Sequence, residues 1–205
     1  MINPNSSETI SDQIRAAIAS DAGVEVVTSS GGPVAIETDA DVAAAVGPML
    51  DVVRTRDAAA VVVACFSDPG LDQLRAESPV PVFGIAESAI RRALELGARV
   101  GIISSVEGSL PRHARYWDRM GVRDRVAADI ALGLGVLELD TEDAFARAVE
   151  AGRELVAAGA DVVVLGCTGM THMQARLESE LAVPVVDPCR AAVDAARAAL
   201  AEAGR

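Results

Sequence analysis

The sequence predicts an α/β protein with parallel sheets, on three observations. Short runs of valine, isoleucine and alanine alternate with longer segments that carry apolar residues at helical spacing. With only three Phe, one Trp and one Tyr, the core must consist of aliphatic side chains, which suits parallel strands covered by helices. Finally, the segment VVVACFSDPG at 61–70 is matched by VVVLGCTGMT at 162–171, so a strand ending in a cysteine occurs twice.

The helical segments are recognised by apolar residues three and four positions apart. In the first of them, Ile10, Ile14 and Ile18 share one face. In the second, Pro48 is expected to kink or break the helix, because proline lacks a backbone N–H. Helices are expected over 9–19, 40–56, 87–97, 110–120, 141–158, 172–181 and 190–203.

The strands are read from short, continuous apolar runs between turn residues. They are expected at 60–66, 81–85, 99–103, 161–166 and 184–187, and 126–140 reads as a strand plus a glycine-rich connection. Strands that alternate with helices form βαβ units and a mainly parallel sheet. Only two residues stand ahead of Asn3, whereas strands usually hold about five. We therefore expect the first strand to be clipped or the start of the sequence to be late.

The two halves of the chain resemble each other. Cys65 aligns with Cys167 and Pro81 with Pro184, and the strand RVGIISS at 99–105 matches the first residues, MINPNSS. Such a pattern indicates one internal duplication of an α/β unit.

We therefore expect two pseudo-symmetric, flavodoxin-like α/β domains with parallel sheets and an active site in the cleft between them. The first domain comprises 1–96 plus 189–205, so the C-terminal helix completes it, and the second comprises 97–188.

Composition narrows the class of partner. The net charge is −12, with 30 acidic against 18 basic residues, which disfavours nucleic acid and anionic membranes. No apolar run approaches the roughly 20 residues of a membrane span, and no secretory signal is visible. Three cysteines without CxxC spacing argue against disulfides and structural zinc. We expect a cytoplasmic protein without a metal.

The duplicated cysteines point to a reaction. Ligands of open parallel sheets bind beyond the carboxyl ends of the strands, where Cys65 and Cys167 are expected. A helix N-terminus lowers the pKa of a thiol from about 8.5 toward neutrality. One thiolate can then remove a proton next to a carbonyl while the other thiol returns one to the opposite face. Backbone N–H groups and the hydroxyls of Ser67 and Thr168 could stabilise the enolate. The sequence has no GxGxxG and no GxxxxGK[ST], and racemisation of this kind needs no cofactor.

Four segments carry a family resemblance: INPNSS (2–7), ACFSDPGLD (64–72), PVFGIAES (81–88) and LGCTGM (165–170). They resemble the aspartate/glutamate/hydantoin racemase superfamily, in particular its hydantoin and allantoin racemase branch. Glutamate racemases would show Asn-Thr after the first cysteine and Thr-His after the second, which this chain lacks.

The resemblance implies a two-cysteine racemase of 5-substituted hydantoins or allantoin, working on a small molecule without a cofactor, and it is compatible with a homo-oligomer. It implies that Cys65 and Cys167 are catalytic. The residues expected to bind substrate are Asn5, Ser6, Phe66, Ser67, Thr168 and Gly169.

Other interpretations stay open at this point. Within the superfamily they are an aspartate or glutamate racemase, a maleate cis–trans isomerase and an arylmalonate decarboxylase; the last needs only one cysteine. Outside it they are a flavodoxin-like binding module and a thiol redox protein. Either cysteine alone would be read as an apolar filler. Cys189 and His172 are interpreted as structural, and Asp68 as a turn residue.

Overall fold

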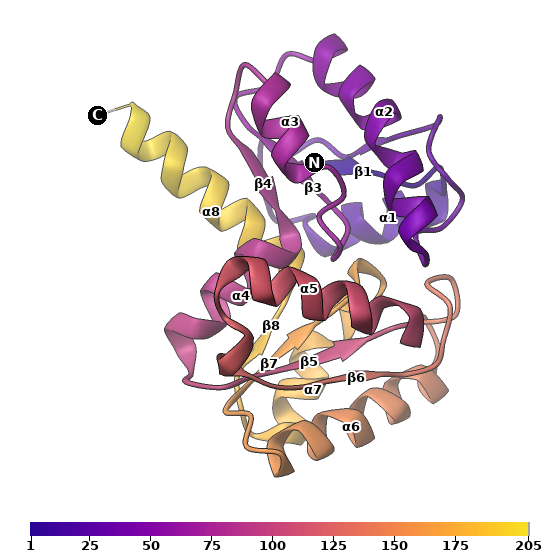
Figure 1. Cartoon of the computed structure of the whole chain (residues 1–205), viewed down its shortest axis with the longest axis vertical. Helices are drawn as coiled ribbons and strands as arrows, with labels where there is room; N and C mark the ends of the chain where they lie inside the picture. Colours follow the sequence, from indigo (N-terminus) through magenta and orange to yellow (C-terminus); the bar gives the residue numbers. More distant parts are fainter. Residues whose placement is uncertain (205) are drawn as a thin grey trace. The chain divides into compact units, whose positions relative to one another are not determined.

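The chain folds into two compact α/β units (Figure 1). The structure is a computed structural model that describes residues 1–204. The first unit contains residues 1–88 and 189–204, and the second contains residues 89–188. The predicted fold class, with parallel sheets in both halves, is confirmed. The predicted division at residue 96 lies at the end of helix α4 (Ile85–Leu96), and it stays a prediction.

In the first unit, short strands alternate with helices. Its elements are β1 (Ile2–Asn3), α1 (Glu8–Ala17), β2 (Val27–Thr28), α2 (Asp39–Thr55), β3 (Val61–Val63), α3 (Leu71–Glu77), β4 (Val82–Gly84) and the long C-terminal α8 (Pro188–Ala203).

The second unit repeats this alternation. Its elements are β5 (Val100–Ser104), the 3-10 helix η1 (Glu107–Ser109), α5 (Leu110–Met120), η2 (Arg123–Arg125), β6 (Val126–Ala131), α6 (Glu142–Ala157), β7 (Val162–Leu165), η3 (Thr168–Met173), α7 (Gln174–Leu181) and β8 (Val185–Val186).

The two sheets have the same strand order. The first runs β2-β1-β3-β4 and the second β6-β5-β7-β8, and all pairs are parallel. Ile2 pairs with Val63 in the first sheet, and Ile103 pairs with Leu165 in the second. In each sheet the strand order reverses between two central strands, β1 and β3 or β5 and β7. That reversal opens a crevice at their carboxyl ends, which is where ligands bind in open α/β sheets.

Helix ends follow the sequence where capping residues are present. Ser7 caps α1, since its side chain accepts a hydrogen bond from the N–H of Ile10. Thr38 and Asp41 form a reciprocal capping box at the start of α2. Gly121, at φ 69°, ends α5, in a conformation that costs other residues more.

One helix and one strand differ from the expectations. Helix α2 runs unbroken through Pro48, because one side of it buries Met49 and Leu50 in the core and this burial offsets the lost hydrogen bond. Strand β2 was not expected, since two residues are too short to give a periodic signal. The pairing of Ile2 with Val27 and of Asn3 with Thr28 defines it.

Helix α8 is tied to the first unit by a buried carboxylate. Asp21, between α1 and β2, forms an ion pair of 2.6 Å with Arg197 and one of 3.4 Å with Arg190. Residues more than 160 positions apart in the sequence are thereby joined, so the end of the chain completes the unit that its beginning starts.

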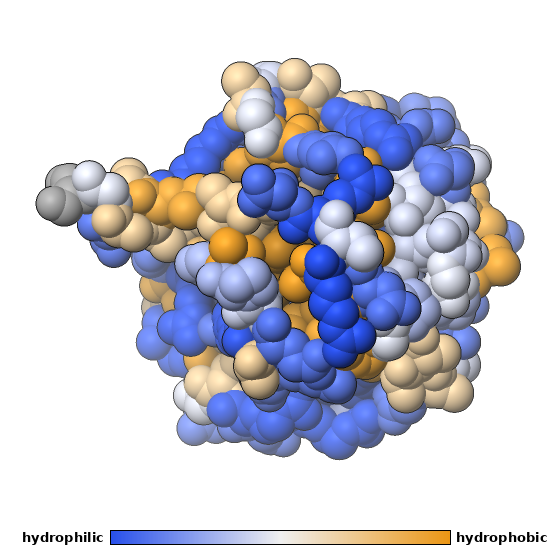
Figure 2. Space-filling view, turned by 90° about the horizontal axis from the view of Figure 1, so that it is seen from above, coloured by the Kyte–Doolittle hydropathy of each residue, from blue (hydrophilic) through white to orange (hydrophobic). Residues whose placement is uncertain are grey.

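The surface carries few large apolar side chains. Among the described residues, the exposed ones are Val34, Leu96 and Leu137, and hydrophilic residues cover much of the face in Figure 2. Within residues 1–204, no helix combines the length and apolar character needed to cross a bilayer.

Asp161 joins the start of β5 to the loop before β7. Its carboxylate accepts hydrogen bonds of 2.9 Å from the N–H groups of Ala98 and Arg99. These bonds lower the pKa of Asp161 below its ordinary value of 3.8.

Because the folded pKa of Asp161 is depressed, its contribution to stability is present above about pH 3.8 and is lost as the pH falls through the folded value. We expect Asp161→Asn to unfold at a lower urea concentration than the wild type at pH 7. The difference between the two unfolding midpoints should shrink at pH 3. Urea titrations at both pH values measure it. A gap that is the same at both would contradict the role of the charge.

Candidate active site

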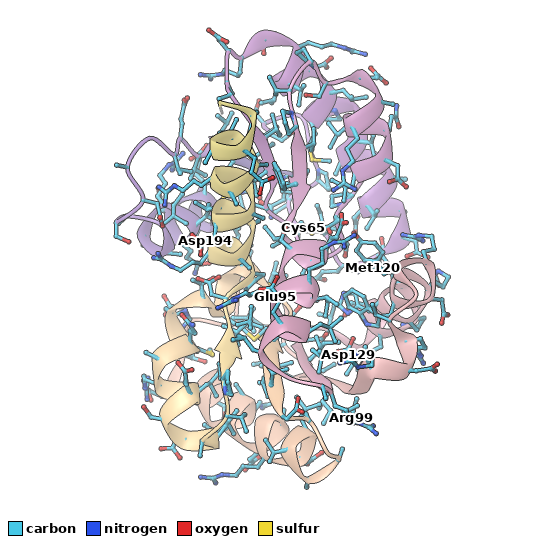
Figure 3. The ribbon with its side chains drawn as sticks, turned by 90° about the vertical axis from the view of Figure 1, so that its left-hand side faces the viewer. Cys65, Glu95, Arg99, Met120, Asp129 and Asp194 are labelled. Carbon is cyan, nitrogen blue, oxygen red and sulfur yellow. The ribbon has the colours of Figure 1, made fainter. Side chains whose placement is uncertain are left out.

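In the first unit, Cys65 and the turn after β1 lie at the same edge of the sheet. The N–H of Ala64 donates to the carbonyl oxygen of Ile2 at 2.8 Å, which holds the end of β3 beside the end of β1. Cys65 is half-buried and follows directly (Figure 3). Asn5 and Ser6 therefore leave β1 at the crevice where Cys65 ends its strand.

The turn after β1 is built from asparagine side chains. Asn3 is fully buried, and its Nδ2 donates to Asn5 Oδ1 at 3.0 Å and to Ser11 Oγ at 3.0 Å. The N–H of Ser7 also donates to Asn5 Oδ1, at 3.0 Å. Two donors thus fix the oxygen of the Asn5 amide, and within residues 1–204 no protein acceptor takes a hydrogen bond from its Nδ2. That amide nitrogen can donate to a ligand oxygen.

Ser6 is anchored to the loop before α2. Its N–H and its Oγ both donate to the carbonyl oxygen of Pro33, at 2.8 and 3.3 Å. The hydroxyl oxygen can still accept a hydrogen bond, so Ser6 can offer an acceptor at the crevice.

The loop after Cys65 is fixed by Asp68. The N–H of Asp68 donates to the carbonyl oxygen of Cys65 at 2.9 Å. Its buried carboxylate accepts from the N–H groups of Ala86 and Glu87, at 3.0 and 2.8 Å, and so caps α4. A side chain at position 84 would collide with this carboxylate, which explains Gly84.

The expectation that Cys65 stands just ahead of a helix needs correction. Residues 66–70 separate Cys65 from α3, which begins at Leu71. Asp68 and Gly70 adopt positive φ values, 42° and 63°, so the backbone cannot continue as a helix there. The helix dipole argument is therefore weaker for this thiol than the sequence suggested, because the effect fades within one turn.

Asp68→Ala is expected to destabilise the first unit by about 2–4 kcal/mol. The change leaves one buried and one partly buried N–H group without their acceptor and puts alanine in a left-handed conformation. Asp68→Asn is the matched control, since asparagine tolerates positive φ and keeps one acceptor. In urea unfolding, stability should fall from the wild type to Asp68→Asn and from Asp68→Asn to Asp68→Ala. Equal stability of alanine and wild type would contradict the capping role.

In the second unit, Cys167 follows β7 and caps the 3-10 helix η3. The N–H of Gly166 donates to the carbonyl oxygen of Ile103 at 2.7 Å, and the N–H of Met170 donates to that of Cys167 at 3.1 Å. Cys167 is 9% exposed. This is the position in its sheet that Cys65 has in the first.

The remaining predicted site residues divide by unit. Phe66 is buried at 3% exposure, and Ser67 is partly exposed. Thr168 is buried directly after Cys167, and Gly169 packs closely against Leu139. The structure thus brings five predicted residues to one unit and three to the other: Asn5, Ser6, Cys65, Phe66 and Ser67, then Cys167, Thr168 and Gly169. Their contact with a substrate stays a prediction.

Two polar residues at the end of β5 were missed. Ser104 and Ser105 are buried where β5 meets the β7 end, the position equivalent to the asparagine turn after β1. The alignment of RVGIISS with MINPNSS contained this signal. Asp129, which hydrogen-bonds Ser104, gave no signal, because a single carboxylate in a strand of mixed polarity marks nothing by itself.

Two further features bear on ligands. A cavity of about 570 Å³ in the first unit lies at the amino ends of β1 and β3, beside α8, and it is lined partly by Met1, Val61 and Val193. None of the predicted site residues lines it. Burial lowers the pKa of the terminal ammonium there.

Within residues 1–204, no group of three or more metal-ligating side chains is found.

Comparison with known proteins places the chain in a family. The family model described as Asp/Glu/Hydantoin racemase matches residues 1–196. A hydantoin racemase of Paenarthrobacter aurescens is 34% identical over 216 aligned positions, which cover 98% of this chain and 90% of that protein. The crystal structure of the allantoin racemase of Pseudomonas fluorescens has a TM-score of 0.91 at 28% identity and covers 99% of this chain and 90% of that one.

The allantoin racemase from Klebsiella pneumoniae is similarly close, with a TM-score of 0.90 at 31% identity over 98% of this chain and 86% of that one. These similarities extend over nearly the whole chain and include both cysteine segments. The predicted resemblance is confirmed, and the chain belongs to the Asp/Glu/hydantoin racemase family.

Proposed function

We propose that this protein is a cofactor-independent racemase of 5-substituted hydantoins or allantoin, with Cys65 and Cys167 as its two proton-transferring groups. The observation that carries the proposal is the equivalence of the two thiols. Each follows the third strand of its unit, at the crevice between the two central strands of a sheet with the same order as the other. Relatives named hydantoin racemase and allantoin racemase support the class of substrate.

The proposed chemistry requires two thiols on opposite faces of one carbon. One thiolate takes the proton from the stereocentre, and the electron pair moves onto the neighbouring carbonyl oxygen. The other thiol then donates its proton to the opposite face, and the electron pair returns to carbon. Donors near the cysteines, such as Thr168 and the Asn5 amide, would stabilise the charged oxygen in between.

The surroundings of the cysteines favour a neutral ring over a dicarboxylate. Phe66 and Gly169 flank the two thiols, and neither offers a charge to a second carboxylate. Aspartate or glutamate would require cationic or several hydroxyl partners. We therefore place hydantoins ahead of amino acids as substrates, and we propose a small-molecule substrate, a cytoplasmic location and a homo-oligomer for the working protein.

A polarimetric screen tests the proposal. Single enantiomers of several 5-substituted hydantoins, allantoin, aspartate and glutamate are incubated with the protein without added cofactor, each beside an enzyme-free sample that corrects for spontaneous racemisation. We expect rotation to decay to zero for hydantoins or allantoin. Decay only with aspartate or glutamate would move the protein to the amino-acid branch, and no decay with any compound would disprove the proposed function.

A further inference from the structure

Three polar side chains of the second unit are joined by hydrogen bonds into a network. Ser104 ends β5, His113 belongs to α5 and Asp129 to β6, and Figure 3 labels Asp129 in this unit. The Asp129 carboxylate accepts hydrogen bonds from Ser104 Oγ at 2.5 Å and His113 Nδ1 at 2.9 Å. Ser104 and His113 are almost fully buried, at 0% and 2% exposure. Buried polar networks of this kind hold their surroundings in a single arrangement.

This network does not have the geometry of a hydrolase triad. In such a triad, histidine bridges serine and aspartate through its two different ring nitrogens. Here His113 Nδ1 lies 2.9 Å from Asp129 Oδ2 and 3.3 Å from Ser104 Oγ, so one nitrogen faces both partners. Ser104 donates directly to the carboxylate and is not exposed. A nucleophilic role for Ser104 is therefore excluded by its contacts.

The network reaches Cys167 through Gly166. The N–H of Gly166 donates to the carbonyl oxygen of Ile103, the residue before Ser104. A Cβ at position 166 would lie 3.1 Å from Ser104 Oγ, so the serine hydroxyl lies against the residue that directly precedes Cys167. A shift of Ser104 is therefore passed to the backbone that carries the thiol.

The equivalent position in the first unit has different chemistry. Asn3, Ser11 and Thr28 come from the first strand, first helix and neighbouring strand of that unit, and they are joined by bonds of 3.0 and 2.7 Å. None of the three carries an ionisable side chain. The residue ahead of Cys65 is Ala64, which has a side chain of its own. Within residues 1–204, only the second unit has an aspartate–histidine network against its cysteine strand.

We propose that Ser104, His113 and Asp129 are positioning residues for Cys167, and that they set its placement without setting that of Cys65. The inference rests on the proposed function and assigns the network to one of the two proton transfers. Loss of the network should therefore impair the two cysteines unequally.

The unequal effect on the two cysteines can be measured as deuterium uptake by the substrate in D2O. When Cys65 thiolate removes the proton from its enantiomer, it becomes a thiol and the electron pair moves to the carbonyl oxygen. If Cys167 is displaced, the Cys65 thiol exchanges its proton for a solvent deuteron and returns that deuteron to the same face. The substrate then gains deuterium without inversion.

Ser104→Ala tests this with each enantiomer of a substrate that the wild type racemises. Inversion is followed by polarimetry and deuterium in the unreacted enantiomer by mass spectrometry. We expect inversion to fall on the order of 10- to 100-fold. The unreacted material of one enantiomer should gain deuterium, which that of the wild type does not, while the other enantiomer should show neither deuterium uptake nor inversion. Asp129→Asn should act in the same direction.

Ser109→Ala is the matched control. Ser109 is another buried serine of the second unit, and its hydroxyl donates to the carbonyl oxygen of Val106 at 2.7 Å, outside the network. Its ratio of uptake to inversion should equal that of the wild type. Slower inversion in Ser104→Ala with no deuterium in the unreacted material of either enantiomer, or unchanged inversion, would overturn the proposal.

A second measurement separates this inference from the proposed function. Alkylation of the native protein by iodoacetamide is followed at each cysteine by mass spectrometry, without substrate. In Ser104→Ala, iodoacetamide should label Cys167 several-fold faster than in the wild type, and it should label Cys65 at an unchanged rate. Unchanged labelling of Cys167 would overturn the positioning role, whereas a wild type without racemase activity would disprove the proposed function alone.

Discussion

Replacing Cys65 or Cys167 by alanine is expected to abolish measurable racemisation of both enantiomers. A positioned acid or base contributes on the order of 10²- to 10⁴-fold to a rate, and each direction of the reaction needs one thiolate and one thiol. Serine at either position should fare little better, because a hydroxyl is a far weaker acid than a thiol at neutral pH. Initial rates by polarimetry for the four single variants measure the effect.

Cys189→Ala is the control for these variants. Cys189 is fully buried at the start of α8 and lies outside the residues assigned to the reaction. Its activity per folded molecule should equal that of the wild type. Turnover retained in Cys65→Ala would refute the two-thiol mechanism and would favour chemistry by a single cysteine.

Gly166→Ala is expected to lower racemisation more than any other change outside the cysteines themselves. A Cβ there would lie 2.6 Å from the carbonyl oxygen of Ile103, a backbone atom that is itself held in the sheet. The strand end must therefore move, which we expect to cost about 1–3 kcal/mol of stability. The same movement displaces Cys167 and should lower racemisation on the order of 10²-fold.

The comparison variant is Gly47→Ala. Gly47 lies within α2, and a Cβ built on it meets no atom within 4 Å apart from its two chain neighbours and the backbone of its own helix. Alanine there should leave racemisation unchanged. Urea unfolding and initial rates on both variants measure these effects. Wild-type activity in Gly166→Ala would show that the placement of Cys167 tolerates movement of its strand.

The architecture could be predicted because its signals are local and repeated. The valine runs before Cys65 and Cys167 mark buried strands, and their duplication marked the shared topology that the strand orders confirm. Helix α2 shows where such reasoning stops. Its proline indicated a break, yet burial of the face that carries Met49 keeps it continuous. Tertiary packing overrode a local rule there.

The site residues could be predicted only where the residue type itself indicates a chemical role. The cysteines and Asn5 stood out in the sequence, and the structure places Asn5 beside the strand that ends in Cys65. Asp68 and Asp129 did not stand out as partners, because their meaning comes from contacts made across the fold. Asp68 reaches N–H groups 18 and 19 residues away, and Asp129 reaches a serine 25 residues away. No periodicity in a single sequence encodes such pairings.

The isotopic content of the product formed in D2O tests the two-thiol mechanism most directly. Each pure enantiomer of a hydantoin that the protein racemises is incubated in D2O to a few per cent conversion. The two enantiomers are then separated, and the deuterium content of each is measured by mass spectrometry. We predict that the newly formed enantiomer carries one deuterium at the stereocentre while the unreacted one keeps protium. This must hold in both directions, since the incoming proton comes from a thiol that exchanges with solvent. A product that retains the original protium would mean that one group removes and returns the same proton, and would contradict the account.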